Sequence, residues 1–220
     1  ERAGMVQNLN GSEGSVSIIG AVSPQGGDFS EPVTQNTKRY VRTFWGLDRA
    51  LAYARHFPSI NWLTSYSEYA DDLRPWYDEH VGPEFVTCRH QMAHLLQKES
   101  ELMEIVKLIG ADILPEDQKL IIETAKLFRV GFLQQNAYHA IDTYVPLDKQ
   151  LRMMELMLKL YHGAKDIVSR AIPLSQLKET GIFESLAKMK YEVPNDGQEK
   201  FAEYDAAIED ALRQVNEANR

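Results

Sequence analysis

Apolar residues in the second half of the chain recur every three or four positions, the spacing that places them on one face of an α-helix. The longest such segment covers residues 83–109 and is followed by Gly110, a residue type that commonly ends helices. Pro83 suits the first turn of a helix, where no backbone N–H is needed. The pattern predicts one long helix, whose apolar stripe consists of Met92, Leu95, Leu96, Leu102, Ile105, Val106 and Ile109.

A second helix is predicted after a short loop over residues 111–114. Pro115 fits its first turn, and the acidic Glu116 and Asp117 suit the positively polarised start of a helix. Its apolar positions are Leu120, Ile121, Ala125, Leu127 and Phe128. The two helices would form a helical hairpin, and further helices are predicted over residues 146–170, 174–179, 182–190 and 198–216.

The first part of the chain has a different pattern. Residues 15–21 (SVSIIGA) have the β-branched and apolar composition of a buried strand, and the following SPQGGDFSEP segment has the proline and glycine content of an ordered loop. From Val33 or Thr34, helical spacing continues to Phe57 and predicts one amphipathic helix that ends before Pro58. We therefore predict a mainly α fold, in which a short α/β segment over residues 1–66 precedes a helical bundle over residues 67–220.

Composition narrows the class of protein. The 220 residues carry a net charge of −8, which gives no electrostatic reason to expect binding to nucleic acid or to an anionic membrane surface. The single cysteine, Cys88, excludes an internal disulfide and fits a reducing, cytosolic compartment. No apolar run approaches the roughly 20 residues that span a bilayer, so we expect no direct membrane insertion.

Few residues suggest chemistry of their own. His90 and His94 lie four positions apart on a predicted helix near Cys88, a spacing that can direct two imidazoles toward one metal ion. However, this is not a structural zinc spacing, and no HExxH glutamate lies between the histidines. Ser65 and Ser67 belong to no nucleophile motif. We predict no metal site and no catalytic residue in this chain.

Two motifs resemble a known family. The runs SPQGGDFSEPVTQNT and HFPSINW are similar to segments of the catalytic A subunit of archaeal and bacterial V-type (A/V-type) rotary ATPases. The order of IVKLIG, ADILPED and FLQQNAY also resembles a helix, an acidic loop and a later FLSQPF run in the related F-type catalytic subunit. Departures from the family pattern are small, with Gln25, Ala54 and Ser59 where relatives commonly have proline, arginine and alanine.

The resemblance implies a fragment of a larger enzyme. No phosphate-binding GxxxxGK[ST] loop occurs here, and Glu1 falls in a segment that lies past that loop in the family. Residues 1–66 would be the end of a RecA-like nucleotide-binding domain, and residues 67–220 would be a helical C-terminal domain with a rotor-facing hairpin. The fragment alone is expected to be inactive, because phosphoryl transfer needs the phosphate loop and a bound magnesium ion.

The resemblance also implies site residues. Phe57 would place its ring against the adenine of a nucleotide, and Gln135, Asn136, Ala137 and Tyr138 would close the other side of the same pocket. A loop that presses on the central rotor shaft would consist of Asp112, Ile113, Leu114, Pro115, Glu116 and Asp117. From residue types alone, however, the loop is an ordinary acidic helix start and Phe57 an ordinary core or turn residue.

In this family, ATP or ADP with magnesium would bind the full-length enzyme, with none expected on the fragment. The partners implied are the non-catalytic B subunit in an alternating ring, the central rotor shaft and a peripheral stalk. The assembled complex would lie on the cytoplasmic face of a membrane and couple ATP hydrolysis or synthesis to proton or sodium transport. The alternatives are a non-enzymatic helical interaction module, the F-type β subunit and the non-catalytic B subunit.

Overall fold

The structure, a computed structural model, describes residues 3–111 and 113–219, leaving out the side chain of Ile109. The chain divides into two compact units, Glu1–Arg42 and Thr43–Arg220. Helices dominate the second unit, and the only sheets in the described residues are two-stranded. This agrees with the predicted mainly α fold.

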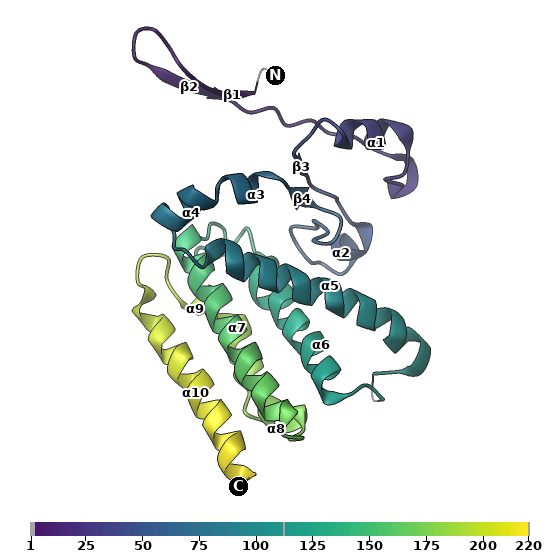
Figure 1. Cartoon of the computed structure of the whole chain (residues 1–220), viewed down its shortest axis with the longest axis vertical. Coiled ribbons are helices and arrows are strands. Elements are labelled where there is room, and N and C mark those ends of the chain that lie inside the picture. Colours follow the sequence, from purple (N-terminus) through teal and green to yellow (C-terminus); the bar gives the residue numbers. More distant parts are fainter. Residues whose placement is uncertain (1–2, 112, 220) are drawn as a thin grey trace. The chain divides into compact units, whose positions relative to one another are not determined.

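The first unit contains a hairpin and one short helix (Figure 1). Strand β1 (Gly4–Gln7) pairs antiparallel with β2 (Glu13–Val16), with Gly4 opposite Val16. A single 3-10 turn, Gln25–Gly27, lies within the predicted loop. Helix α1 (Pro32–Lys38) begins where the carboxylate of Glu31 accepts hydrogen bonds from the backbone N–H groups of Val33 and Thr34, both at 3.0 Å. An acidic N-cap followed by proline is a common way to start a helix.

The predicted strand over residues 15–21 is wrong beyond Val16. Strand β2 ends there, and Ile18 and Ile19 are exposed rather than buried. Composition alone suggested this strand, but a strand exists only where a neighbouring strand accepts its hydrogen bonds. In the described residues, the only partner of β2 is the four-residue strand β1.

The single helix predicted from residue 33 to residue 57 is also wrong. Helix α1 ends at Lys38, and β3 (Thr43–Phe44) then pairs with β4 (Tyr66–Ser67). Helix α2 (Arg49–Tyr53) starts anew because the carboxylate of Asp48 accepts hydrogen bonds from the N–H groups of Ala50 (2.7 Å) and Leu51 (3.3 Å). Aspartate at this position is a strong helix-start signal, and here it overrides the continuous apolar spacing.

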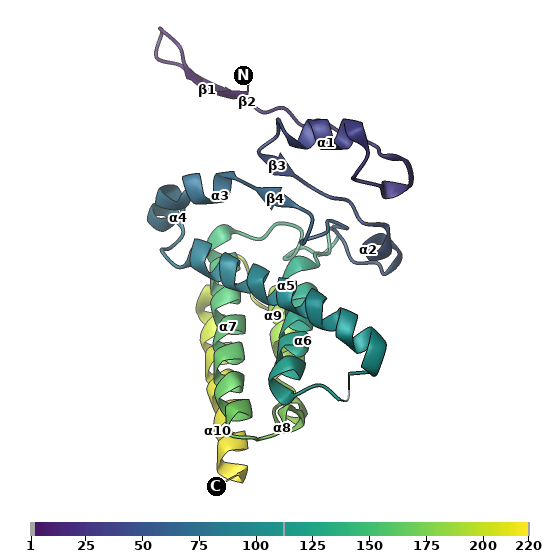
Figure 2. The ribbon, with the colours of Figure 1, turned by 45° about the vertical axis from the view of Figure 1, so that its right-hand side comes forward.

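The second unit continues as a helical bundle (Figures 1 and 2). The short helices α3 (Tyr69–Asp72) and α4 (Arg74–His80) lead into α5 (Phe85–Ile109), which ends at Gly110 with φ +86°. Helix α6 (Glu116–Phe128) follows Pro115, and a π-helical turn (Arg129–Leu133) ends it. The remaining helices are α7 (Leu147–Ser169), α8 (Leu174–Glu179), α9 (Ile182–Glu192) and, after a 3-10 turn at Gln198–Lys200, α10 (Phe201–Ala218). Helices α5 to α10 agree with the predicted segments to within a few residues, whereas α3 and α4 were not predicted.

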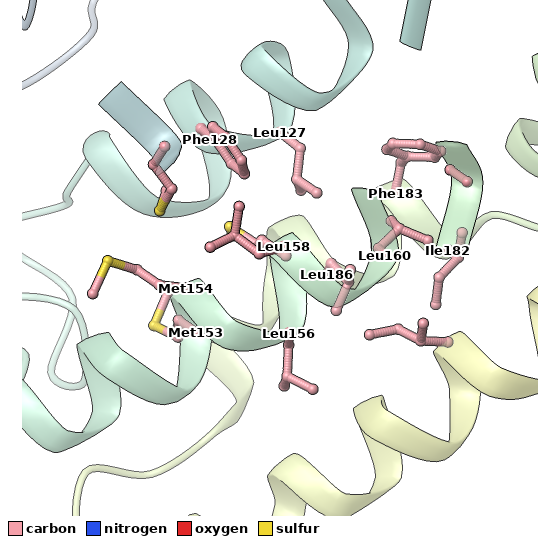
Figure 3. Close-up of a cluster of buried hydrophobic side chains, with 14 of the residues drawn as sticks. Leu127, Phe128, Met153, Met154, Leu156, Leu158, Leu160, Ile182, Phe183 and Leu186 are labelled. Atoms are coloured by element: carbon pink, nitrogen blue, oxygen red, sulfur yellow. The ribbon is translucent and has the colours of Figure 1, made fainter. Parts of the chain in front are cut away.

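Helix α7 lies at the centre of the bundle and contacts α5, α6, α8, α9 and α10. Its apolar residues are buried along almost its whole length, and Figure 3 shows them meeting side chains of α6 and α9. Each fully buried Leu or Met side chain contributes about 1.5–3 kcal/mol. The residues labelled in that view are Leu127, Phe128, Met153, Met154, Leu156, Leu158, Leu160, Ile182, Phe183 and Leu186.

The apolar stripe predicted for α5 is buried only in its first part. Met92, Leu95 and Leu96 belong to the core, whereas Ile105 near the end of the helix is exposed, as is Leu108 outside the predicted stripe. The end of α5 therefore extends beyond the part of the bundle that buries it. Every helix in the described part of the chain is too short or too polar to cross a bilayer.

Gly131 is expected to be required for close packing between the π-helical turn and α9. A Cβ atom there would lie 2.8 Å from Met157 Cε and 3.1 Å from the backbone Cα of Ala187. Alanine is the better helix former by about 1 kcal/mol, but overpacking against backbone costs roughly 1–3 kcal/mol. We expect Gly131→Ala to lower the free energy of unfolding by about 1 kcal/mol in urea denaturation.

The matched control is Gly197→Ala, whose Cβ would meet only Glu199 Oε2, at 3.5 Å. This variant is expected to unfold at nearly the wild-type urea concentration. Equal midpoints for the two variants would mean that the bundle can relax around residue 131.

Candidate functional site

The segment around Phe57 presents an aromatic ring at the surface. Phe57 is 51% exposed, and a cis peptide bond joins it to Pro58. The preceding His56 is buried, with its ring 5.5 Å from that of Trp62. Burial lowers the pKa of His56, and the positive charges of Lys190 and Arg129 lower it further. His56 is thus buried directly before Phe57, while the Phe57 ring stays accessible.

A second segment far along the chain lies directly beside the first. The N–H of Gln135 donates a 2.7 Å hydrogen bond to the carbonyl of Phe57. The side-chain amide of Gln134 donates to the carbonyl of Arg55 at 3.2 Å. The structure therefore brings together Phe57 and Gln135, two of the residues that the sequence suggested for one pocket.

The other three suggested pocket residues form an exposed turn. The N–H of Asn136 donates to Oδ2 of Asp142 at 2.6 Å, and the N–H of Tyr138 donates to Oδ1 of Asn136 at 3.0 Å. Ala137 lies between them, and the Tyr138 side chain is almost fully exposed. Their polypeptide backbone is fixed, while their side chains face solvent. Their role in binding a base stays a prediction.

Three charged residues that sequence reasoning missed lie beneath this turn. Asp142, Lys149 and Lys190 are at most 2% exposed. Lys149 lies four residues before Met153 on α7, and Lys190 lies four residues after Leu186 on α9, so both occupy positions on an apolar helix face. Lysine is almost never fully buried without partners, and this placement is the signal that could have identified both residues.

A cavity of about 200 Å³ adjoins the turn. Its volume has room for several water molecules, and its lining is partly polar. Gln135 and Asp142, which lie before and after the turn, line this cavity together with Gln150 of α7. The complete lining is Phe132, Leu133, Gln135, Asp142, Val145, Gln150 and Met153.

The loop between α5 and α6 divides into outward and inward residues. Ile113 is 70% exposed, and Pro115 and Asp117 are also exposed. Leu114, in contrast, is buried. Asp112, which the sequence also assigned to this loop, lies outside the described residues.

Glu116 connects this loop to α8. Its carboxylate accepts hydrogen bonds from the backbone N–H of Leu174 at 2.8 Å and from Lys119 Nζ at 2.9 Å. Leu174 is the first residue of α8, so Glu116 satisfies an N–H that has no partner within that helix. A second link joins the same two helices where Lys178 Nζ lies 3.0 Å from Glu123 Oε1.

The geometry gives no support to a metal site. Within residues 3–111 and 113–219, no three His, Cys, Asp or Glu side chains cluster as metal ligands would. Cys88 is buried, and burial raises the pKa of its thiol to about 11, with smaller contributions from Glu155 and Glu84. A thiol with this pKa stays protonated and is a poor ligand and nucleophile.

Two family models match successive parts of the chain. Residues 1–67 match the nucleotide-binding domain of the ATP synthase alpha/beta family. Residues 74–178 match the C-terminal domain of V and A type ATP synthase. The second match includes the α5–α6 loop, the exposed turn after the π-helical segment and most of the bundle.

Characterised relatives match at high identity. The chain is 56% identical over 196 residues to the V-type ATP synthase alpha chain 2 of Clostridium tetani, covering 89% of this chain and 33% of that protein. It is 50% identical to the V-type ATP synthase alpha chain of Halothermothrix orenii, covering 96% and 36%. It is 46% identical to the A subunit of the A-type ATP synthase of Methanopyrus kandleri, covering 99% and 37%. The chain thus spans about a third of the length of these relatives.

One solved structure shares the fold. It is described as a unique ATP synthase subunit NeqB from Nanoarcheaum equitans, with a TM-score of 0.56 and 20% sequence identity. The match covers 68% of this chain and 36% of the solved one. At this identity the likeness supports the fold of the bundle alone.

Glu116 is expected to make stability depend on pH. The hydrogen bond from Leu174 and the contact with Lys119 lower the pKa of Glu116 below its usual value of 4.5. A depressed folded-state pKa means that the stabilisation is complete above the unfolded-state pKa and is lost as the pH falls through the folded-state value. We expect Glu116→Gln to unfold at lower urea than wild type at pH 7, and the difference to be smaller at pH 3, which lies below the usual value of 4.5.

Glu104→Gln is the matched control, since the ion-pair partner of Glu104 among the described residues is the exposed Lys107 in the adjacent turn. An exposed pair of this kind contributes little, so its midpoint should follow wild type at both pH values. A difference for Glu116→Gln that persists unchanged at pH 3 would contradict the assigned role of the carboxylate.

Proposed function

The chain belongs to the ATP synthase alpha/beta family with the C-terminal domain of V and A type ATP synthase, and we propose that it is the C-terminal part of a catalytic A subunit. The whole protein would hydrolyse or synthesise ATP and couple that reaction to proton or sodium transport across a membrane. The observation that carries this proposal is the 46–56% identity to A subunits and alpha chains over at least 89% of the chain.

The names of these relatives favour the A subunit over the non-catalytic B subunit, the F-type β subunit and an independent interaction module. In the proposed arrangement, residues 1–66 end the nucleotide-binding domain and residues 67–220 form the helical domain. ATP or ADP with magnesium would bind the complete enzyme, because phosphoryl transfer needs phosphate-loop groups that this chain does not contain.

The chain would contribute to the adenine pocket. Phe57 has an accessible ring, and its carbonyl is hydrogen-bonded to Gln135 at the start of the turn that carries Asn136, Ala137 and Tyr138. An aromatic face can stack on a purine without a hydrogen bond, which contributes about 1–3 kcal/mol per base in nucleic-acid complexes. These residues would retain the nucleotide and take no part in bond making.

The loop between α5 and α6 would contact the central rotor shaft. Ile113 and Leu108 expose apolar side chains at this end of the hairpin, and these side chains would supply an apolar contact to the shaft. Glu116 faces α8, so its role in this loop would be to hold the tip rather than to touch the shaft.

The partners in this proposal are B subunits in an alternating ring, the rotor shaft and a peripheral stalk. The assembled complex would lie on the cytoplasmic face of its membrane. In this arrangement the chain would reach the membrane only through the other subunits of the complex.

The adenine assignment predicts that Phe57→Ala weakens ATP binding in the assembled enzyme. Loss of stacking worth about 1–3 kcal/mol should raise the KM for ATP roughly 5- to 150-fold, with a smaller effect on kcat. Steady-state hydrolysis by the complex measures both constants. Tyr53→Ala, which removes another exposed ring from the same unit, should leave the KM at the wild-type value. An unchanged KM for Phe57→Ala would reject the assignment.

The rotor assignment predicts a loss of coupling when the tip becomes polar. We expect Ile113→Ser to reduce ATP-driven ion transport more than ATP hydrolysis, because an apolar contact with the shaft is lost while the nucleotide site is intact. Transport and hydrolysis would be measured together in sealed vesicles. Ile105→Ser changes an exposed isoleucine on α5 outside the loop and should keep the wild-type ratio. The same ratio in both variants would exclude Ile113 as a shaft contact.

A further inference from the structure

Two lysine side chains are buried beneath the proposed adenine turn without a hydrogen-bonded carboxylate. Lys149 on α7 is 0% exposed, and Lys190 on α9 is 2% exposed. Burial lowers the pKa of both lysines, and the negative charge of Asp142 acts in the opposite direction. Because a buried charge is costly unless it is fully hydrogen-bonded, the partners of these lysines show what the arrangement stabilises.

Lys190 binds the backbone that leads into the turn. Its Nζ donates hydrogen bonds to the carbonyls of Val130, at 2.7 Å, and Gln134, at 2.5 Å. The same ammonium lies 4.8 Å from the centre of the Tyr191 ring, within the range of a cation–π contact. The two carbonyls lie within and just after the π-helical turn, so Lys190 fixes the direction in which the chain leaves α6.

Lys149 binds the other components of the same network. Its Nζ has three partners, which matches the three donors of an ammonium group: the carbonyls of Lys190 (3.2 Å) and Val193 (2.7 Å) and Oδ1 of Asn195 (3.0 Å). The amide nitrogen of Asn195 donates in turn to the carbonyls of Ile141, at 3.1 Å, and Tyr144, at 2.8 Å. Lys149 thus orients Asn195, and Asn195 holds the end of the turn.

The segment over residues 134–145 has no helix or strand of its own, so side chains supply many of its hydrogen bonds, beside backbone ones such as that from Thr143 N–H to the carbonyl of His139 at 2.9 Å. Lys190 binds its first residue, and Asp142, which belongs to the segment, accepts from the N–H of Asn136. Asn195 and Gln150 bind its last carbonyls, with Gln150 donating to Val145 at 2.8 Å. These contacts position the whole segment from α7, α9 and the loop after α9.

The network extends to Phe57 by a short route. Gln134, whose carbonyl accepts from Lys190, donates its side-chain amide to Arg55. The next residue, Gln135, donates its N–H to the Phe57 carbonyl. A displacement of residues 134 and 135 would therefore move both sides of the proposed pocket.

We propose that Lys190, together with Lys149 and Asn195, is a positioning residue for nucleotide binding: it holds the turn that carries Gln135–Tyr138 against the Phe57 backbone. These residues do not touch the nucleotide, and they act through the placement of the turn. The proposal rests on the function proposed above, since it assumes that Phe57 and the turn form the adenine pocket.

The test uses the full-length protein in its assembled complex. Lys190→Met keeps an unbranched side chain that ends one atom short of the ammonium it removes. Asn195→Ala removes the contacts to Ile141 and Tyr144 at a half-buried position that tolerates truncation better. Lys188→Met, two residues before Lys190 on the exposed face of α9, is the matched control. ATP hydrolysis gives KM and kcat, and thermal unfolding shows that each variant is folded.

We expect Lys190→Met and Asn195→Ala to raise the KM for ATP about tenfold with little change in kcat, since each variant loses hydrogen bonds that hold the turn. Lys188→Met should behave as wild type. In a double-mutant cycle, Lys190→Met should have a smaller effect once Phe57→Ala is present, because part of its effect arises through displacement of Phe57.

Folded Lys190→Met or Asn195→Ala complexes with the wild-type KM, alongside a raised KM for Phe57→Ala, would overturn the positioning role and leave the adenine assignment standing. Fully additive effects in the cycle would overturn it as well, because they would show that Lys190 does not act through the placement of Phe57. If the Lys190→Met variant does not fold, the KM of the Asn195→Ala variant decides whether the positioning role holds. An unchanged KM for Phe57→Ala would reject the adenine assignment itself, and the positioning role with it.

Discussion

Burial of α7 is the constraint on which the second unit depends. This helix contacts five other helices, so nearly every side of it must be apolar or hydrogen-bonded. The leucine and methionine residues along it satisfy the first condition and hold α6, α9 and α10 in place (Figure 3). A well-packed interior loses stability when even one methylene is added or removed, so the positions of the surrounding helices are closely specified.

The same constraint explains why the ammonium group of Lys149 is so completely partnered in this core. Lys149 cannot reach solvent from α7, and each of its three donors therefore finds an oxygen. Those oxygens belong to the end of α9 and the loop after it. Burial of a lysine is energetically costly, but here the hydrogen bonds of Lys149 orient backbone that is neither helix nor strand. Apolar packing cannot orient such backbone, because the hydrophobic effect is non-directional.

The sequence predicted the bundle well because helical spacing and helix-end signals agree there. Gly110 ends α5 with positive φ, and Pro115 precedes α6 as its composition indicated. The prediction failed before residue 66, where Asp48 starts a new helix inside a continuous apolar pattern and β3 pairs with residues more than twenty positions away. Strand pairing between residues so far apart in the sequence leaves no signal in the local sequence pattern. The pocket residues came from a resemblance, whereas Lys149 and Lys190 could have been recognised as charges on apolar helix faces.

The link between Glu116 and Leu174 affects how force would pass through the domain. A tip joined to the bundle only by its two helices could bend independently at its base. Here the first turn of α6 is tied to the first residue of α8, and Lys178 and Glu123 join the same helices one to two turns further on. Two attachment points on one pair of helices resist rotation as well as separation. A force applied to the hairpin would therefore pass to α6 and α8 together, and the hairpin would bend little at its base.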